Sequence, residues 1–214
     1  GDVILYGGYG MNETGYYRYF NDTWAFDMQT LTWSQVDTPV NPGKRSYHEM
    51  AGDHSGNIMM FGGYIDGVGY DENTWRYRDG NWTMVESTTH PESLRYHAMK
   101  HDRGNDMIVV FGGYKATAPY YSDETWVLDG STGSWSLIET NTTPLARYYH
   151  DMAYDSGKMV MFGGFVETEF DLYLRFSMDQ GQNWSEFVHV SDNEDAKLTT
   201  SNEAPALAIG ERTY

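Results

Sequence analysis

Three pairings of arginine with histidine are the residues of this chain best suited to chemistry. In each pairing an arginine precedes a histidine, and a methionine follows the histidine two positions later. The arginines are Arg45, Arg95 and Arg147, and the histidines are His48, His97 and His150. Guanidinium groups bind anions and imidazoles exchange protons near neutral pH. Because the pairing recurs, whereas an active site breaks a repeat, we favour buried hydrogen-bonded groups over ligand contacts.

Tyrosine supplies the second candidate chemistry, with 18 tyrosines in 214 residues. Six of them fall in stretches that we expect to be loops: Tyr16, Tyr17, Tyr19, Tyr70, Tyr120 and Tyr121. A tyrosine ring adds contact area and a hydroxyl group at low entropic cost, and loops on a rigid scaffold commonly carry binding sites. These tyrosines and the three arginines are the predicted ligand-binding residues. Packing of the rings against one another is the competing interpretation.

Other reactive groups are sparse. The chain has no cysteine, so it has no disulfide, no thiolate metal site and no cysteine nucleophile. Acidic loops around Asp66 and Asp192 offer oxygen ligands for calcium, but they lack the spacing of a calcium loop, and solvated loops are favoured. None of the seven histidines shows metal-ligand spacing. The sequence therefore predicts no catalytic residue, no metal site and no cofactor.

The formal net charge of −17 restricts the partners. Nucleic acids and anionic membranes are recognised through basic patches, so neither is expected here. Of five Asn-x-Ser/Thr triplets, Asn12, Asn21 and Asn141 are the glycosylation candidates, because the other two asparagines directly precede a tryptophan that should be packed. Acidity and sequons together favour an extracellular or cell-surface glycoprotein.

These residues must be positioned by a four-fold repeat. Glycine pairs occur at residues 7–8, 62–63, 112–113 and 163–164, about 50 to 55 residues apart, each closing an apolar run. Two tryptophans follow each of the first three pairs, the first at 24, 75 and 126 and the second at 33, 82 and 135. A period near 50 with paired glycines and spaced aromatics is typical of a four-stranded propeller blade.

Each unit is expected to contain four short strands. The first carries the His-x-Met motif (residues 47–51 in one unit), and the second is the apolar run before the glycines, at 3–6, 57–61, 107–111 and 158–162. The third carries the first tryptophan, at 23–26, 74–77 and 125–128, and the fourth begins near the second, at 33–36, 82–85 and 135–138. Asp-Gly turns join the third and fourth strands of two units. The predicted fold class is all-β.

The order of motifs resembles the kelch repeat over residues 1–165. Within a unit an arginine and a histidine come first, then an apolar run ending in Gly-Gly, then Asn-Asp/Glu-Thr-Trp and a second Trp. The resemblance places the three arginines at equivalent positions and implies a β-propeller, usually of six or seven blades, acting most often as a binding platform. A minority of the family are enzymes, such as the galactose-oxidase group. Those copper radical oxidases need a cysteine cross-linked to tyrosine, which this chain lacks.

Residues 166–214 form a second segment of the same propeller. Ser177, Asp179, Gly181 and Trp184 resemble the Asp-box (BNR repeat) of sialidase-type propellers, Ser-x-Asp-x-Gly-x-x-Trp. In that family the box is a structural hairpin remote from the active site. The apolar run 204–209 resembles the inner strand of a further unit. Either this strand closes a four-bladed ring with the first unit, or the chain is part of a larger propeller, which we favour.

The predicted function is a non-catalytic, extracellular or cell-surface module that recognises a protein or a glycan through its tyrosine-rich loops. A carbohydrate-active enzyme, sialidase-like or galactose-oxidase-like, is the alternative, because a sialidase also uses three arginines from different blades. An intracellular adaptor is the third interpretation. Assembly with other chain segments or subunits is expected if the sheet edges are open.

Overall fold

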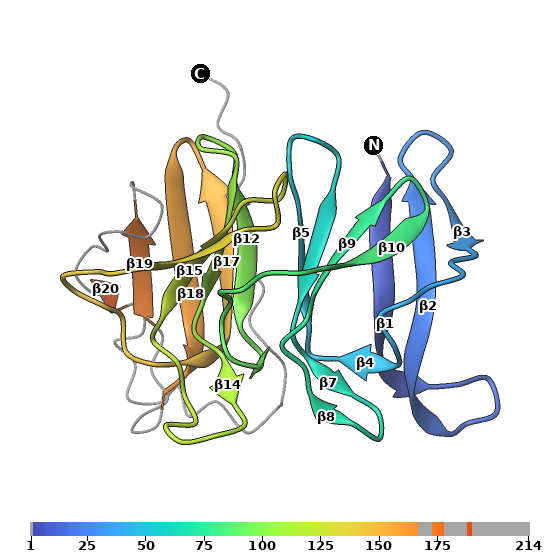
Figure 1. Ribbon diagram of the computed structural model, residues 1–214, viewed down its shortest axis with the longest axis horizontal. Coiled ribbons are helices and arrows are strands. Elements are labelled where there is room, and N and C mark those ends of the chain that lie inside the picture. Colours follow the sequence, from blue (N-terminus) through green and yellow to red (C-terminus); the bar gives the residue numbers. More distant parts are fainter. Residues whose placement is uncertain (1, 167–172, 178–187, 190–214) are drawn as a thin grey trace.

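The computed structural model describes residues 2–166, 173–177 and 188–189. All regular structure in these residues is β-strand, and none of them lies in a helix (Figure 1). Accordingly, the described residues contain no helix of the length and apolarity needed to cross a membrane. The expected all-β propeller architecture is confirmed, with one main antiparallel sheet, called a blade below, for each repeat unit.

The four blades follow one another along the chain. Blade 1 consists of β1 (Val3–Met11), β2 (Tyr17–Asp27) and β3 (Thr32–Val36). Blade 2 consists of β5 (Glu49–Gly52), β6 (Ile58–Phe61), β9 (Thr74–Arg78) and β10 (Asn81–Val85). Blade 3 consists of β12 (Ala98–Asp102), β13 (Met107–Phe111), β15 (Thr125–Leu128) and β16 (Trp135–Ile138). Blade 4 consists of β17 (Tyr148–Asp155), β18 (Lys158–Phe165), β19 (Tyr173–Ser177) and β20 (Val188–His189).

The expected strands recur with small shifts, and β13, β15 and β16 have the predicted bounds. The main difference is at the glycine pairs of blades 1 and 4, where β1 and β18 continue past the expected stop. In blade 1 the register shifts between Tyr6 and Gly8, after which β1 keeps pairing with β2 as far as Met11. The glycines therefore bend a long strand there, whereas in blades 2 and 3 they end the strand.

The glycine pairs are required where one blade meets the next. Gly62 and Gly63 have φ angles of +68° and +94°, a region that side chains rarely adopt. A Cβ atom on Gly62 would lie 2.4 Å from the carbonyl oxygen of Leu94, at the start of the next unit. A Cβ atom on Gly63 would lie 2.6 Å from the carbonyl oxygen of Ser46 in its own unit. This glycine pair is thus a point of close backbone approach both between blades and within one blade.

The core lies between adjacent blades and is rich in aromatic and methionine side chains. Tryptophans of the fourth strands join neighbouring blades through hydrogen bonds. The Trp82 indole N–H donates to Thr23 Oγ1 of blade 1 over 3.0 Å, and the Trp135 indole N–H donates to Thr74 Oγ1 of blade 2 over 2.9 Å. Trp33, with no blade before it among the described residues, is 48% exposed.

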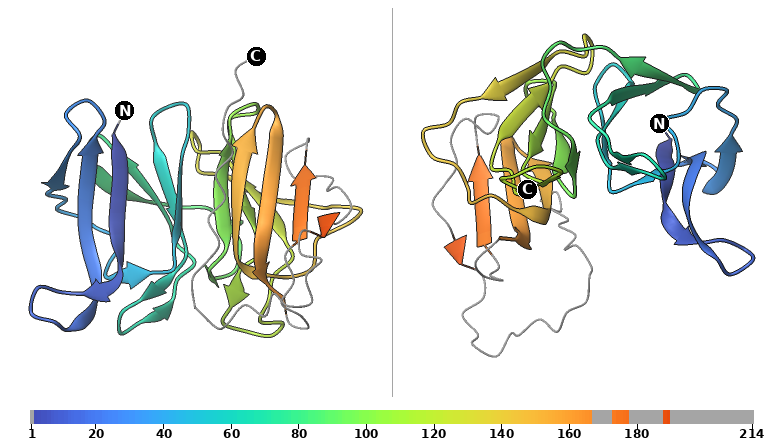
Figure 2. Two further views of the ribbon diagram at one scale, coloured as in Figure 1. Left: turned by 180° about the vertical axis from the view of Figure 1, so that it is seen from behind. Right: turned by 60° about the horizontal axis from the view of Figure 1, so that its bottom comes forward.

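Two short sheets lie at one end of the blades, opposite the hairpins that join first to second and third to fourth strands (Figure 1). They consist of β4 (Arg45–Ser46), β7 (Tyr64–Ile65) and β8 (Gly69–Tyr70), and of β11 (Leu94–Arg95) with β14 (Tyr114–Lys115). Seen from a lower viewpoint, the blades follow an arc (Figure 2). The predicted strand at 204–209 lies outside the described residues.

Candidate functional site: a tyrosine-lined recognition face

The strand register corrects the expected equivalence of the three arginines. Arg45 pairs with Ile65, two residues after the glycine pair of its unit, whereas in the next unit the matching residue Lys115 pairs with Leu94. Arg95 pairs with Tyr114, which places it at the position of Ser46, the partner of Tyr64. Blade 3 therefore has leucine where blade 2 has its arginine, and Arg95 is displaced by one residue.

Contacts between blades confirm this register. The Gly63 N–H donates to the Leu94 carbonyl over 2.8 Å, and the Gly113 N–H donates to the Arg147 carbonyl over the same distance. Leu94 and Arg147 are thus equivalent. The sequence contains the signal, because Arg95 stands two residues before its histidine and Arg147 stands three before His150.

The two arginines that keep the repeat register are parts of the framework. Arg45 is 1% exposed and donates from Nη1 to Asp71 Oδ2 over 2.7 Å and to the Gly62 carbonyl over 2.9 Å. Its Nε donates to the Pro42 carbonyl over 2.9 Å. Arg147 is also 1% exposed and donates from Nη1 to the Gly163 carbonyl over 3.0 Å. A surface ligand does not reach these guanidinium groups, although the sequence nominated both.

Arg95 has different surroundings. Its guanidinium carbon lies 4.5 Å from the centre of the Tyr70 ring, 4.8 Å from that of Tyr114 and 5.1 Å from that of Tyr96. Cation–π attraction of this kind holds a guanidinium group in place without using up its N–H donors. Arg95 makes no ion pair among the described residues, and its Nε has no hydrogen-bond partner there. The position equivalent to Asp71 is occupied by Ser122.

Three further tyrosines, which the sequence analysis did not nominate, form a series next to Arg95. Tyr47, Tyr96 and Tyr149 each directly precede the repeated histidine and share a left-handed backbone, with φ of 63°, 57° and 59°. Their ring centres are 4.4 Å apart for Tyr47 and Tyr96, and 4.1 Å apart for Tyr96 and Tyr149. Backbone hydrogen bonds join the same residues in series. Burial and a hydrogen bond with Tyr149 raise the pKa of Tyr96.

The structure joins five of the six predicted tyrosines through ring contacts. Tyr70 and Tyr120 stack on Tyr114, with ring centres 6.4 Å and 6.0 Å from it, and Tyr121 stacks on Tyr148 at 5.5 Å. Tyr19 contacts Tyr64 at 5.7 Å, which continues the series towards blade 1.

Two of the predicted tyrosines, Tyr16 and Tyr17, lie at the exposed margin. Tyr17 is 64% exposed and stacks on Tyr9, and Tyr16 is 74% exposed. The rings therefore pack against one another, as the competing interpretation expected, and they form a connected series; ligand binding by these tyrosines stays a prediction. We call the tyrosines of this series, with Arg95, the recognition face.

The repeated histidines belong to the framework as well. Burial lowers the pKa of His48 to about 4, and the pKa values of His97 and His150 to about 3. The ring of His97 packs edge-on against Phe61, and that of His150 packs edge-on against Phe111. These imidazoles are therefore neutral at physiological pH. The expected hydrogen bonding is not found for His97, whose ring nitrogens have no partner among the described residues.

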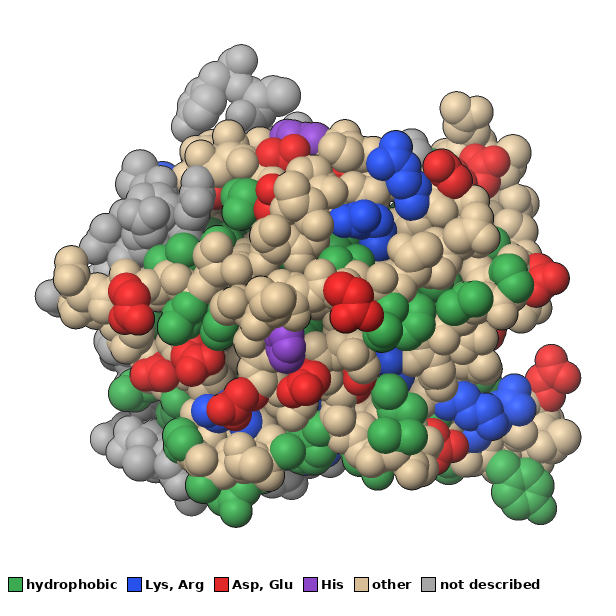
Figure 3. Space-filling model, viewed as in Figure 1, with side chains coloured by type: hydrophobic (Ala, Val, Ile, Leu, Met, Phe, Trp, Pro, Cys, Tyr) green, Lys and Arg blue, Asp and Glu red, His purple; other side chains and the backbone are tan. Residues whose placement is uncertain are grey.

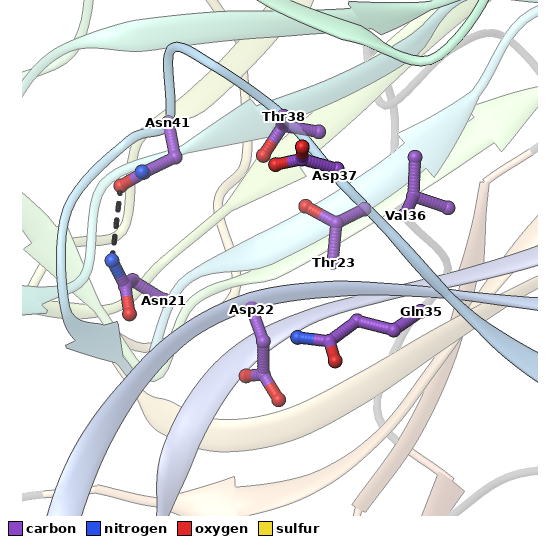
Figure 4. Close-up of a pocket in the computed structure, with 8 residues that line it drawn as sticks. All are labelled: Asn21, Asp22, Thr23, Gln35, Val36, Asp37, Thr38 and Asn41. Carbon is purple, nitrogen blue, oxygen red and sulfur yellow. Dashed lines mark hydrogen bonds between the residues drawn. The ribbon is translucent and has the colours of Figure 1, made fainter.

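A polar hollow beside blade 1 repeats from unit to unit. It has a volume of about 420 Å³ and includes Thr23, Val36 and Asp37 among its lining residues (Figure 4). The equivalent hollow in blade 2 is lined in part by Thr74 and Val85. Because a hollow lies at the same place in blades 1 and 2, we attribute it to blade geometry rather than to a specific site.

Acidic side chains are spread over the surface shown in Figure 3 instead of forming one patch. This distribution gives the protein a diffuse negative potential, consistent with its net charge of −17. Of the Asp-box, Ser177 ends β19 and pairs with Met159, while Asp179, Gly181 and Trp184 lie outside the described residues. The sequon residues Asn21 and Asn141 are exposed, and Asn12 is half-buried.

Comparison with known proteins finds the same repeat. The sequence profile described as the KLHDC2/KLHL20/DRC7 Kelch-repeats domain matches residues 1–205. Kelch domain-containing protein 10 of Homo sapiens is 25% identical over 179 residues, covering 76% of this chain and 40% of that protein. Kelch domain-containing protein 3 of Mus musculus is 28% identical over 181 residues, covering 76% of this chain and 44% of that protein. The chain thus spans less than half the length of these relatives.

Proposed function

The chain belongs to the kelch-repeat domain family, and from this premise we propose that it is a non-catalytic recognition module that binds a segment of a partner protein on the recognition face. Arg95 is the anion-binding centre of this face. The tyrosine rings supply contact area around it, at little cost in side-chain entropy.

The observation that carries this proposal is the break in the repeat at Arg95. In blade 2 a buried carboxylate of Asp71 neutralises Arg45, so nothing remains for a ligand. In blade 3 both members of that pair are replaced, and an arginine appears one position along, stacked on rings from two units. A guanidinium group held by rings keeps N–H donors free for a carboxylate or phosphate.

The charge of the module limits what the partner segment is. A strongly acidic segment is repelled by a protein of net charge −17, whereas one anionic group among apolar or aromatic residues is not. Tyrosine surfaces favour such amphipathic segments, because each ring offers both an apolar face and a hydroxyl group. We therefore expect a partner segment with a single acidic side chain flanked by apolar residues.

Selection from a displayed peptide library on the immobilised protein tests this proposal. Selected peptides should share one anionic position, and Arg95→Ala should weaken their binding at least tenfold, measured by fluorescence anisotropy. Arg103→Ala is the matched control, because it removes the same charge from an exposed site in the hairpin at the other end of blade 3. The proposal is wrong if no peptide is enriched, or if the selected peptides bind the Arg95→Ala protein equally well.

A glycan remains the second partner class in this proposal, supported by the exposed rings of Tyr17 and Tyr120. A glycan array, read with wild-type and Tyr17→Ala or Tyr121→Ala proteins, separates the classes. Saturable glycan binding lost in these variants would replace the protein partner by a sugar. Turnover of any arrayed sugar would instead establish a carbohydrate-active enzyme.

An extracellular or cell-surface location is a separate proposal, supported by the exposed sequon residues Asn21 and Asn141. Expression through a secretory pathway, followed by enzymatic deglycosylation and intact-mass measurement, tests whether these asparagines are modified. A loss of mass abolished by Asn141→Gln and Asn21→Gln supports export. An unmodified protein supports the intracellular adaptor. The Asp-box remains a proposal of the same kind, and the expected hairpin role of Asp179 predicts that Asp179→Ala lowers stability without changing peptide binding.

A further inference from the structure

Two hairpins of adjacent blades meet at the end of the molecule opposite the recognition face. One joins β5 to β6 and carries His54, and the other joins β12 to β13 and carries Asp106, with His101 near the end of β12. His54 and His101 also line an open cavity of about 520 Å³ bordered by the inner strands β5, β12 and β17. Histidine and acidic side chains meet at the upper edge of the space-filling view (Figure 3).

The three side chains converge on one carboxylate oxygen. His101 Nε2 lies 2.9 Å from Asp106 Oδ1, and His54 Nδ1 lies 3.5 Å from the same atom. One ligand atom from each residue lies within 4.8 Å of the other two. The two imidazole rings pack edge to face with centres 4.8 Å apart, so both nitrogens border the same small volume.

We propose that His54, His101 and Asp106 bind a divalent transition-metal ion of the zinc type, which joins the hairpins of blades 2 and 3. Ligands about 2.0–2.1 Å from a tetrahedral Zn²⁺ lie about 3.3 Å from one another, close to the separations found here. Small rotations of the exposed His54 side chain bring its nitrogen to that distance. Solvent water supplies the remaining coordination position.

The donor set selects the class of ion. Two imidazole nitrogens and one carboxylate oxygen suit zinc and its transition-metal neighbours. Calcium takes six to eight oxygen ligands and magnesium requires near-octahedral oxygen coordination, and three donors that are mostly nitrogen provide neither. Calcium, the one ion that the acidic loops brought into consideration, is therefore not the ion of this site.

The backbone conformation and hydrogen bonding of Asp106 hold its carboxylate in place between the two histidines. Its backbone is left-handed, with φ of 54°, and its Oδ1 also accepts the backbone N–H of His54 over 3.1 Å. Within the part of the chain that the structure describes, such a cluster occurs only at the junction of blades 2 and 3. Counting from the repeated histidine, the positions of His54 and His101 are occupied in blade 4 by Ser156 and Tyr154. As with Arg95, a departure from the repeat marks the candidate site.

Isothermal titration of the protein, carrying no polyhistidine tag, with ZnCl₂ tests the proposal. One saturable site per chain is expected, weakened at least tenfold in His101→Ala and in Asp106→Asn. His90→Ala is the matched control, because His90 lies in a different loop and its Nδ1 contacts the Pro91 carbonyl. CaCl₂ and MgCl₂ should give no saturable binding.

A second measurement keeps the test decisive if a variant folds poorly. Binding of Co²⁺ to the wild-type protein should produce visible d–d absorption bands, which ZnCl₂ in excess should remove. The thermal unfolding midpoint of the wild-type protein should rise when Zn²⁺ is added. The midpoint of the folded double variant, which carries His54→Ala and His101→Ala, should not rise. Absence of saturable Zn²⁺ binding by the wild type, or undiminished binding by the double variant, would overturn the proposal.

Discussion

Blades 2 and 3 answer the same structural requirement in different ways. At the entry to its first strand, blade 2 buries an arginine that is paired with Asp71, whereas blade 3 buries Leu94 and Ser122 at the two equivalent positions. Blade 3 needs no carboxylate at this point, because Leu94 carries no charge that burial would leave unpaired. The difference releases one arginine, Arg95, for the surface. In this protein, repetition marks the framework and departure from repetition marks the candidate site.

Breaking the ion pair of blade 2 should have the largest effect on stability. Asp71→Ala leaves the buried Arg45 guanidinium without its carboxylate, which should lower the free energy of unfolding by about 3–5 kcal/mol. Urea denaturation followed by tryptophan fluorescence measures this loss.

The double variant Arg45→Leu, Asp71→Ser gives blade 2 the residues of blade 3, and its stability should recover most of the loss. Ser122→Ala is the control, expected to cost about 1 kcal/mol because it removes one hydrogen bond to the Glu124 N–H. A double variant no more stable than Asp71→Ala would contradict the equivalence of the two blades.

The hydrogen bond from a fourth-strand tryptophan to the preceding blade should make the next largest contribution to the free energy of unfolding. Trp135→Phe removes the N–H that donates to Thr74 Oγ1, a hydroxyl on a residue that is 3% exposed. A buried hydroxyl left without its partner should lower the free energy of unfolding by about 1–3 kcal/mol. Trp33→Phe, at the exposed equivalent in blade 1, should change it by less than about 0.5 kcal/mol. Equal effects at both positions would show that the loss is not specific to this hydrogen bond.

The repeated histidines should make stability depend on pH. Their pKa values are lowered from 6.5 to between about 3 and about 4 in the folded protein, so the unfolded chain binds more protons in this window. The contribution of the neutral histidines to the free energy of unfolding is complete above pH 6.5, and it is lost as the pH falls from 6.5 towards 3. Each histidine should add up to about 1.4 kcal/mol per pH unit to the slope.

The slope of unfolding free energy against pH is the readout, because it is insensitive to packing lost in a variant. His97→Gln should reduce this slope by the contribution of one titrating histidine. Burial raises the pKa of Glu49 to about 7, so this group acts in the opposite sense between pH 4.5 and 7. Glu49→Gln should therefore steepen the slope in that range. An unchanged slope in His97→Gln would mean that His97 is not buried in its neutral form.

The framework was readable from the sequence because its physics is local and repeated. Apolar runs, glycine pairs and spaced tryptophans predicted the bounds of β13, β15 and β16. The displacement of Arg95 was also readable, from its distance to His97, but alignment on arginine instead of histidine concealed it.

The sites themselves were less accessible. The rings around Arg95 come from β8, β14 and the residue beside β11, and the residues near Asp106 come from two hairpins of different blades. Such clusters form only when blades pack at a particular angle and offset, which no spacing within one unit encodes. Tyr47, Tyr96 and Tyr149 are intermediate: their shared place before the histidine was visible, but their left-handed backbone and mutual stacking were not.

A small effect on stability, together with the largest effect on binding, is expected at Arg95. Arg95→Ala removes cation–π contacts with three rings but leaves no buried counter-charge, so the free energy of unfolding should fall by about 0.5–1 kcal/mol. Arg95→Lys keeps the charge but loses the planar fork and its stacking, and it should not restore peptide binding. Thermal unfolding and anisotropy on the same samples separate the two quantities. A loss of stability comparable to that of Asp71→Ala would make Arg95 a framework residue like Arg45, and blade 3 would then carry no released cation.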